Sequence, residues 1–297
     1  MIERENTLEI WIEQFLTDLC NANRSPHTCR AYATDLRRLA AFYDGPAEAI
    51  SVDTLREFLQ SFAHLKPASR ARKQAALNSF FTWAYRHDLV SANPMAKIES
   101  VQRPTRKIRA LPRAQVEKSL NVIPANQLRD RLFFRLLFET GLRVGEALGL
   151  YVEDLDLTLD DEHMTVLGKG GKRRTVLLDD PRLVVQLRTY LKQTSYQHGP
   201  LFRARKNGQG GPLRYQSMQQ RWQNYCEESG IKCTLHQLRH SHATELVNDG
   251  VSLATIRKRL GHKNIQTTLR YAEQSDETAD AELRAWRRKR RAYLNEQ

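Results

Sequence analysis

The stretch NQLRDRLFFRLLFETGLRVGEALGL, residues 126–150, decides the fold of the longer half of this chain. Its residues up to Thr140 have the character of a strong helix, and Gly141 follows as a helix-ending glycine. Arg143 stands directly after this turn, at the start of a second helix, where the helix N-terminus favours anions. Glu146 follows three residues later and can orient the arginine. The stretch therefore predicts two helices joined by a turn that presents a guanidinium group to an anion.

A small β region is expected after this stretch. HMTVLG, residues 163–168, and RRTVLLD, residues 173–179, are rich in β-branched residues and partly alternate in polarity. KGGK, residues 169–172, lies between them and has the composition of a turn. The pattern predicts an antiparallel hairpin inside an otherwise helical region, because helical sequence resumes at Pro181 and continues to a basic tail, residues 279–297.

The residues that precede the stretch are expected to form helices only. These helices are expected within residues 8–20, 25–43, 52–63 and 68–90. Leu8, Trp11 and Phe15 recur at helical spacing in the first of them. The second opens with Ser25 as an N-cap, followed by Pro26 at the first helical position.

The length of the chain and one proline-containing segment indicate two domains. A chain of 297 residues favours two domains over one. Residues 101–112, VQRPTRKIRALP, contain two prolines and several basic residues but no acid, which is typical of an exposed linker. We therefore expect a mainly α protein. A helical N-terminal domain, residues 1–100, precedes a mainly helical C-terminal domain, residues 113–297, which carries a small antiparallel β-sheet.

The charge of the chain points to a polyanionic partner. Lys and Arg number 47 against 34 Asp and Glu, a formal net charge of +13, which suits nucleic acid better than other partners. A merely soluble basic protein stays open on composition alone. The four cysteines form no CxxC pair, the N-terminus is too charged for a signal peptide, and no apolar run approaches the roughly 20 residues of a membrane span. A cytoplasmic protein without a membrane partner is expected.

The stretch LHQLRHSHATEL, residues 235–246, permits three interpretations. His236 and His240 are four residues apart, as on a zinc-binding helix, but the HExxH pattern is missing and Arg239 places a cation between them. We therefore expect no metal site. Residues 243–262 follow the helix, glycine turn and helix order of DNA-binding regulators, which need no reactive side chain.

Phosphoryl transfer without a metal is the third interpretation. Preorganised cations must hold the charge of a phosphodiester in transfer, and the planar fork of arginine binds two oxygens at once. His236 and Arg239 lie one helical turn apart and can address one phosphate. The chain also supplies the other groups that such a site needs. Arg143, next to Glu146, is a second arginine, and Lys169, between glycines on the hairpin, can donate a proton. LGHKNIQTTLRYAEQ contains His262 as a further donor and Tyr271 as a nucleophile. Each residue alone has an ordinary structural explanation, but their order favours this chemistry.

The combination resembles the tyrosine recombinase (phage integrase) family, and it is most similar to the Xer-like site-specific recombinases. SPHTCRAYATDLRRL resembles the helical core-binding (SAM-like) domain of that family, and the motifs ETGLRVGEALGL, VLGKGGKRRTVLL, LHQLRHSHAT and LGHKNIQTTLRYA resemble its catalytic boxes. The resemblance covers nearly the whole chain. Four motifs in the family's order make it specific, and it implies a C-terminal catalytic domain.

The resemblance assigns groups that hold the scissile phosphate. Arg143 and Arg239 would clamp it, and His262 would donate a hydrogen bond to a non-bridging oxygen. Glu146 would support the arrangement. The family works without metal ions, nucleotides or other cofactors.

The resemblance also assigns the groups that make and break bonds. Tyr271 would attack phosphorus and form a 3′-phosphotyrosine, and Lys169 would protonate the leaving 5′ oxygen. His236 would take part in proton transfer with the nucleophile or the leaving group. The phenol needs neighbouring groups that activate it, because a tyrosine with a pKa of about 10 is a poor nucleophile at neutral pH.

Duplex DNA carrying a recombination site is the partner that the resemblance implies, bound by a homo-tetramer. Basic residues expected to contact this DNA are Arg30, Arg70, Arg72, Lys73, Arg106, Lys107, Lys172 and Arg173. A paired recombinase or an accessory DNA-bending protein stays open as a further partner, and so does the choice between resolution, integration and excision.

His242 and Lys263 depart from the usual Xer-like pattern. Two rivals are a regulator that never breaks DNA and a monomeric type IB-like topoisomerase.

Overall fold

The computed structural model describes residues 8–102, 110–168, 171–204, 211–262, 266–269, 271, 283–288 and 290–291. Arg106, Lys107 and Lys169 lie outside these ranges. The chain divides into two compact units, residues 1–106 and 107–297, and the boundary falls inside the expected linker. Each unit has its own hydrophobic core.

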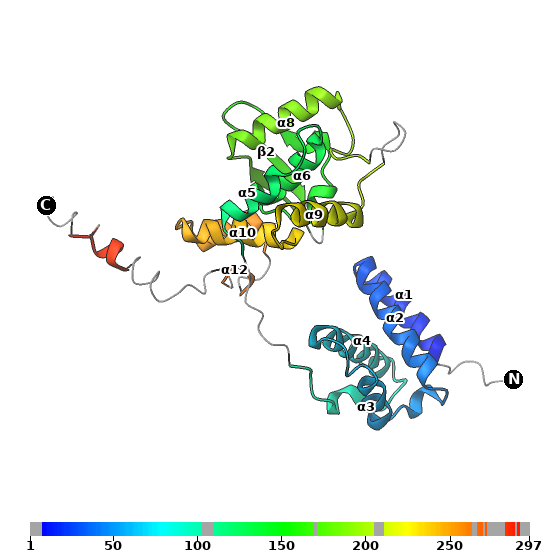
Figure 1. Ribbon diagram of the computed structural model, residues 1–297. Helices are drawn as coiled ribbons and strands as arrows, with labels where there is room; N and C mark the ends of the chain where they lie inside the picture. The colour runs from blue at the N-terminus through cyan, green and yellow to red at the C-terminus, as the bar shows by residue number, and fades with distance from the viewer. Residues whose placement is uncertain are drawn as a thin grey trace. The chain divides into compact units, whose positions relative to one another are not determined.

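The described residues of the N-terminal unit are helical. They form α1 (Leu8–Asn21), α2 (Pro26–Phe42), α3 (Val52–Gln60) and α4 (Pro67–Arg86), with short 3-10 turns at Ala47–Ala49 and Pro94–Lys97. Ser25 caps α2, because its hydroxyl accepts a hydrogen bond from the backbone N–H of Thr28 at 3.2 Å. Phe15 of α1 meets Phe80 of α4 edge to face at 5.6 Å. Figure 1 shows α1 and α2 side by side, and α4 packs against both.

A buried ion pair links α2 to α4. Asp35 and Lys73 are 1% and 2% exposed, and the Lys73 ammonium lies 2.7 Å from the Asp35 carboxylate. Lys73 is one helical turn before Leu77, which is fully buried, so the helical period turns the lysine inward. The expectation that Lys73 contacts DNA is therefore wrong. Arg72 also pairs with Asp35, but its side chain remains partly exposed.

Replacement of Asp35 by alanine is expected to destabilise the protein by about 3 kcal/mol, because the Lys73 charge would stay buried without its partner. Urea unfolding followed by circular dichroism measures this loss. The exposed pair Arg37–Glu13, whose atoms are 2.8 Å apart, provides the control. Arg37→Ala should cost less than about 1 kcal/mol. Equal losses for the two variants would show that the Asp35 pair has no special weight.

Helices also dominate the described residues of the C-terminal unit. The helices are α5 (Arg113–Asn121), α6 (Leu128–Thr140), α7 (Val144–Leu148), α8 (Pro181–Thr194), α9 (Tyr215–Ser229), α10 (Leu235–Asn248), α11 (Leu253–Leu260) and α12 (Gln266–Leu269). A 3-10 turn, Val152–Asp154, leads into the strands β1 (Leu155–Asp156), β2 (His163–Leu167) and β3 (Arg173–Leu177). This composition confirms the expected mainly α fold.

The strands form one antiparallel sheet in the order β1-β2-β3. Thr165 of β2 faces Thr175 of β3, and the pairing of these two strands confirms the predicted hairpin. The strand β1 was not predicted, because two residues are too few to show an alternating pattern. None of the described helices combines the length and the apolar character needed to cross a membrane.

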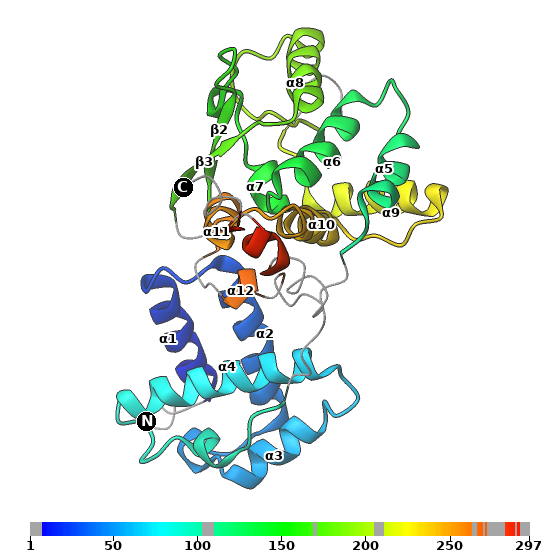
Figure 2. The same ribbon diagram turned by 90° about the vertical axis from the view of Figure 1, so that its left-hand side faces the viewer.

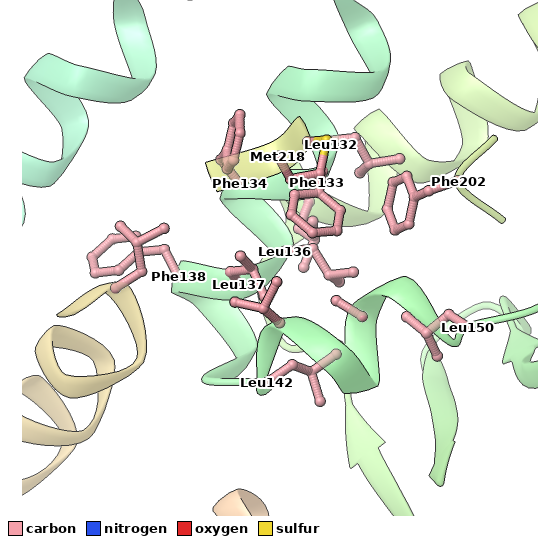
Figure 3. Close-up of a cluster of buried hydrophobic side chains, with 14 of the residues drawn as sticks. Leu132, Phe133, Phe134, Leu136, Leu137, Phe138, Leu142, Leu150, Phe202 and Met218 are labelled. Carbon is pink, nitrogen blue, oxygen red and sulfur yellow. The ribbon is translucent and has the colours of Figure 1, made fainter. Parts of the chain in front are cut away.

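The helix α6 is the centre of the C-terminal core. Phe133, Leu136, Leu137 and Phe138 are all fully buried, on different sides of the helix. In Figure 3, Phe133 lies beside Phe202, whereas Phe138 lies on the opposite side of the helix; all of them belong to one apolar core. The helix packs against α8 and α10, and Gly141 at its end packs closely against His242 of α10. This rigid end positions the turn that carries the first arginine of the site.

Candidate active site

The turn after α6 places Arg143 at the start of α7. Gly141 has φ of +62°, a left-handed conformation that glycine adopts without strain. A Cβ atom there would lie 2.5 Å from Leu260 and 2.7 Å from His242, so the close packing also requires glycine. The sequence therefore predicts this turn correctly, and the turn brings α10 and α11 against Arg143.

Glu146 holds Arg143 through two hydrogen bonds. The guanidinium of Arg143 donates to Oε1 of Glu146 at 2.7 Å, and its backbone N–H donates to Oε2 at 2.9 Å. The same guanidinium donates to the carbonyl of Gly261 at 3.3 Å. About a third of the Arg143 side chain remains exposed. The structure thus brings together the arginine and the acid that the sequence pairs, and leaves the arginine accessible.

Arg239 of α10 is the second arginine of the site. Its side chain is 3% exposed and donates to the carbonyls of Gly141 at 2.6 Å and Leu260 at 2.8 Å. Burial, and next the charge of Arg143, lower the pKa of Arg239 to about 10. It still carries its charge at neutral pH. The two carbonyls fix the fork of Arg239 in one orientation.

A third arginine, Arg174 of β3, joins this group, and the sequence analysis missed it. It donates to both carboxylate oxygens of Glu146, at 3.0 and 2.9 Å, and to the carbonyl of Arg259 at 3.1 Å. Arg174 thereby ties β3 to Glu146 and to the end of α11. Figure 2 shows β3 beside α11. Strand alternation is the signal that could have found it, because Arg174 lies on the same face as the buried Val176.

The arginines keep Glu146 ionised. Burial opposes its ionisation, but hydrogen bonds from Arg174 and from the backbone of Arg143 outweigh this and lower the pKa of Glu146 to about 2. The carboxylate therefore stabilises the folded protein at any pH above the ordinary pKa of a glutamate. That contribution is lost as the pH falls through the lowered pKa.

Glu146→Gln is expected to unfold more easily than the wild type by roughly 3 kcal/mol at pH 7. The difference should shrink steadily between about pH 5 and pH 2, because Glu146 of the unfolded wild type takes up its proton first, while the folded carboxylate stays ionised until about pH 2. Urea unfolding of both proteins at several pH values measures it. A difference that does not change with pH would show that the charge of Glu146 is not what stabilises the fold.

Tyr271 is the candidate nucleophile, and two histidines surround it. It is 7% exposed, and its hydroxyl oxygen is 2.7 Å from Nδ1 of His240. Its ring stacks parallel to the ring of His262, with centroids 6.1 Å apart. His262 is also buried, and its Nδ1 is 2.8 Å from the Thr268 hydroxyl. Burial, and next the charges of Arg239 and Arg143, lower the pKa of His262 to about 4, so this ring is neutral at pH 7.

Thr268 and His240 are further site residues that the sequence analysis missed. If the Thr268 hydroxyl donates to Nδ1 of His262, the ring carries its proton on Nε2, where it can donate outward. His240 entered the sequence analysis only as half of a rejected metal pair. The sequence gave no sign that His240 contacts Tyr271, because the two residues are 31 positions apart and meet only in the folded protein.

His236 lies at the surface next to His240. The two rings meet edge to face, with centroids 4.7 Å apart. Desolvation by its neighbours, then the charges of Arg239 and Arg143, lower the pKa of His236. His236 therefore joins the site through its contact with His240.

His242 departs from the Xer-like pattern without disturbing the site. It is buried, and its Nε2 accepts a hydrogen bond from Arg259 at 3.1 Å. Burial, and next the charge of Arg259, lower the pKa of His242 to about 3, so it is a neutral ring that packs beside Gly141. His242 therefore fills the space that an aromatic residue is expected to fill in the Xer-like pattern.

The remaining predicted DNA contacts lie on the surface or outside the described residues. Lys169 falls outside them; of its described neighbours, Gly168 donates from its N–H to the Lys172 carbonyl at 2.8 Å. Lys172, Arg173 and Arg30 are exposed, and Arg70 is half-buried. Within the part of the chain that the structure describes, no group of three or more His, Cys, Asp or Glu side chains is placed to hold a metal ion.

Comparison with known proteins matches both units. Residues 109–278 match the phage integrase family, and residues 12–88 match its N-terminal SAM-like domain. Tyrosine recombinase XerA of Thermococcus kodakarensis is 32% identical, over 88% of this chain and 90% of that protein. A crystal structure of XerH bound to palindromic difH in a post-cleavage complex has a TM-score of 0.79 at 20% identity, covering 96% of this chain and 98% of that one.

A crystal structure of a lambda integrase tetramer bound to a Holliday junction has a TM-score of 0.73 at 19% identity. It covers 89% of this chain and 80% of that chain. At such low identity these two structures show a shared fold. The family match spans more than half of the chain, and the Xer relative spans most of it. The chain therefore belongs to the phage integrase family of tyrosine recombinases.

Proposed function

We propose that this enzyme cuts and rejoins duplex DNA at specific sites through a 3′-phosphotyrosine on Tyr271. The observation that carries the proposal is the convergence of three groups on three consecutive residues at the end of α11. Arg239 binds the carbonyl of Leu260, Arg143 binds the carbonyl of Gly261, and Tyr271 stacks on His262. Two cations and a phenol are thus gathered around one short segment, as a phosphodiester reaction requires.

Each group has a chemical task in this proposal. The guanidinium groups of Arg143 and Arg239 hold the non-bridging oxygens, and Glu146 keeps Arg143 in place. His262, neutral and with Nε2 available, donates a further hydrogen bond to the phosphate. Tyr271 attacks phosphorus while the P–O5′ bond breaks.

The remaining tasks concern protons. Lys169, which follows β2 in the sequence, gives a proton to the leaving 5′ oxygen. His236 takes part in proton transfer near the phosphate. The phosphotyrosine keeps the energy of the phosphodiester, so rejoining needs no nucleotide. The formal charge of +13 suits a DNA partner.

Strand exchange requires two DNA sites, and we propose a tetramer that holds both. The fold is shared with a lambda integrase tetramer bound to a Holliday junction, which supports this assembly. We expect the enzyme to act in the cytoplasm on a recombination site in duplex DNA. A second recombinase or a DNA-bending protein would act as a helper at that site.

A nicked suicide substrate tests the proposal. Duplexes that the protein binds are selected from a randomised library, and nicks are placed across the selected site so that the cleaved strand diffuses away. We expect a protease-sensitive covalent complex that still forms in excess EDTA, because guanidinium groups supply the positive charge. Failure to form a covalent complex on any nicked duplex would contradict it. Relaxation of supercoiled plasmids regardless of sequence, without joining of two sites, would favour a topoisomerase.

A further inference from the structure

The hydroxyl of Tyr271 has a defined partner that the roles assigned above leave unused. Nδ1 of His240 lies 2.7 Å from the phenolic oxygen, a short distance for a nitrogen–oxygen hydrogen bond. The two rings are tilted by 50°, with centroids 5.6 Å apart, so they meet through these atoms rather than by stacking. His240 therefore touches the atom that is proposed to attack phosphorus.

Among the described residues, the other groups around Tyr271 are less suited than His240 to receive its proton. Guanidinium groups such as that of Arg239 have no acceptor atom. His262 lies parallel to the Tyr271 ring, and its Nδ1 is engaged with the hydroxyl of Thr268 at 2.8 Å. His236 meets His240 edge to face at 4.7 Å. His236 thus packs against the imidazole that contacts the phenol.

We infer that His240 is a catalytic residue that accepts the phenolic proton as Tyr271 attacks. This inference rests on the proposed function, since it requires Tyr271 to be the nucleophile. With the ring proton on Nε2, Nδ1 of His240 holds a lone pair toward the phenol. His236, whose ring packs edge to face against that of His240, keeps the part in proton transfer proposed above.

The proton and bond changes balance in both directions. During cleavage the Tyr271 proton moves to Nδ1 of His240, the Tyr271 oxygen forms its bond to phosphorus, and the P–O5′ bond breaks. The 5′ oxygen takes its proton from the acid proposed to be Lys169. During rejoining the 5′ hydroxyl returns its proton to that acid, and the His240 imidazolium returns its own to the departing phenolate.

His240→Asn separates proton transfer from simple positioning. The amide oxygen of asparagine can occupy the place of Nδ1 and accept a hydrogen bond, but it cannot take up a proton at neutral pH. We expect cleavage of the nicked duplex to slow by about 10²- to 10⁴-fold, with unchanged affinity for the same duplex. If His240 only held the phenol in place, His240→Asn would cleave at nearly the wild-type rate, which would overturn the inference.

A substrate with sulfur at the 5′-bridging position distinguishes the two sides of the reaction. A thiolate leaves without a proton, so this substrate should restore cleavage by Lys169→Ala. It should not restore cleavage by His240→Asn, whose defect lies on the nucleophile. Recovery of His240→Asn on the sulfur substrate would place His240 at the leaving group and overturn the inference.

Tyr271→Phe distinguishes failure of the inference from failure of the proposed function. A covalent complex with Tyr271→Phe would remove the nucleophile assignment and the inference together. If Tyr271→Phe forms no complex but His240→Asn cleaves like the wild type, only the role of His240 is wrong. Thermal unfolding of each variant checks that the fold is retained.

Discussion

Tyr271→Phe is expected to abolish covalent capture of DNA while leaving DNA binding intact. The substitution keeps the ring that stacks on His262 and removes only the hydroxyl that contacts His240. Because the proposal places the attack on this hydroxyl, the covalent complex should fall to the background of the assay. The nicked duplex, followed by denaturing gel electrophoresis, measures the complex, and a gel shift measures binding.

Tyr190→Phe provides a matched control for this result. Tyr190 lies on α8, is 4% exposed, and donates from its hydroxyl to the Leu201 carbonyl at 3.2 Å. Its replacement also removes a buried hydroxyl, but from the core instead of the site. We expect Tyr190→Phe to keep the covalent activity at a modest cost in stability. Loss of covalent capture in both variants would indicate damage to the fold rather than loss of a nucleophile.

Arg239→Lys is expected to slow cleavage by about 10²- to 10³-fold, the effect of losing one preorganised donor to a transition-state oxygen. Lysine keeps the positive charge but lacks the planar fork that reaches the carbonyls of Gly141 and Leu260. The orientation of the cation toward the phosphate should therefore be lost, while attraction to DNA remains. Single-turnover cleavage and equilibrium binding on the same duplex separate the two effects.

Arg129→Lys is the control for burial of an arginine. The Arg129 side chain is 7% exposed and pairs with Asp130 at 2.8 Å, on the side of α6 that faces the core. We expect it to lower stability and to leave the cleavage rate nearly unchanged. If Arg239→Lys weakens DNA binding as much as it slows cleavage, Arg239 is an ordinary phosphate contact without a role in the transition state.

The parts of the fold that the sequence predicted are those set by local chemistry. The Gly141 turn, the Ser25 cap and the hairpin around KGGK each depend on a few neighbouring residues, and the structure confirms all three. The helical period also reveals buried faces. It could have corrected the assignment of Lys73, which shares its face with Leu77.

The site was harder to predict where it depends on tertiary contacts. Arg174, His240 and Thr268 meet Glu146, Tyr271 and His262 from distant or separate elements, and no spacing in the sequence reports such contacts. The motif order predicted which residues carry the reaction. It did not identify the residues that orient them, since orientation is decided by packing between α10, α11 and the hairpin.

Identification of the amino acid that becomes joined to DNA tests the central claim most directly. Trypsin cleaves after Arg270 and Arg284, so the peptide YAEQSDETADAELR, residues 271–284, contains Tyr271 and no other tyrosine. After trapping on the nicked duplex and digestion with nuclease and trypsin, mass spectrometry should find this peptide with a nucleotide joined through its 3′ phosphate to Tyr271. A nucleotide on another residue, or at its 5′ phosphate, would contradict the proposed mechanism.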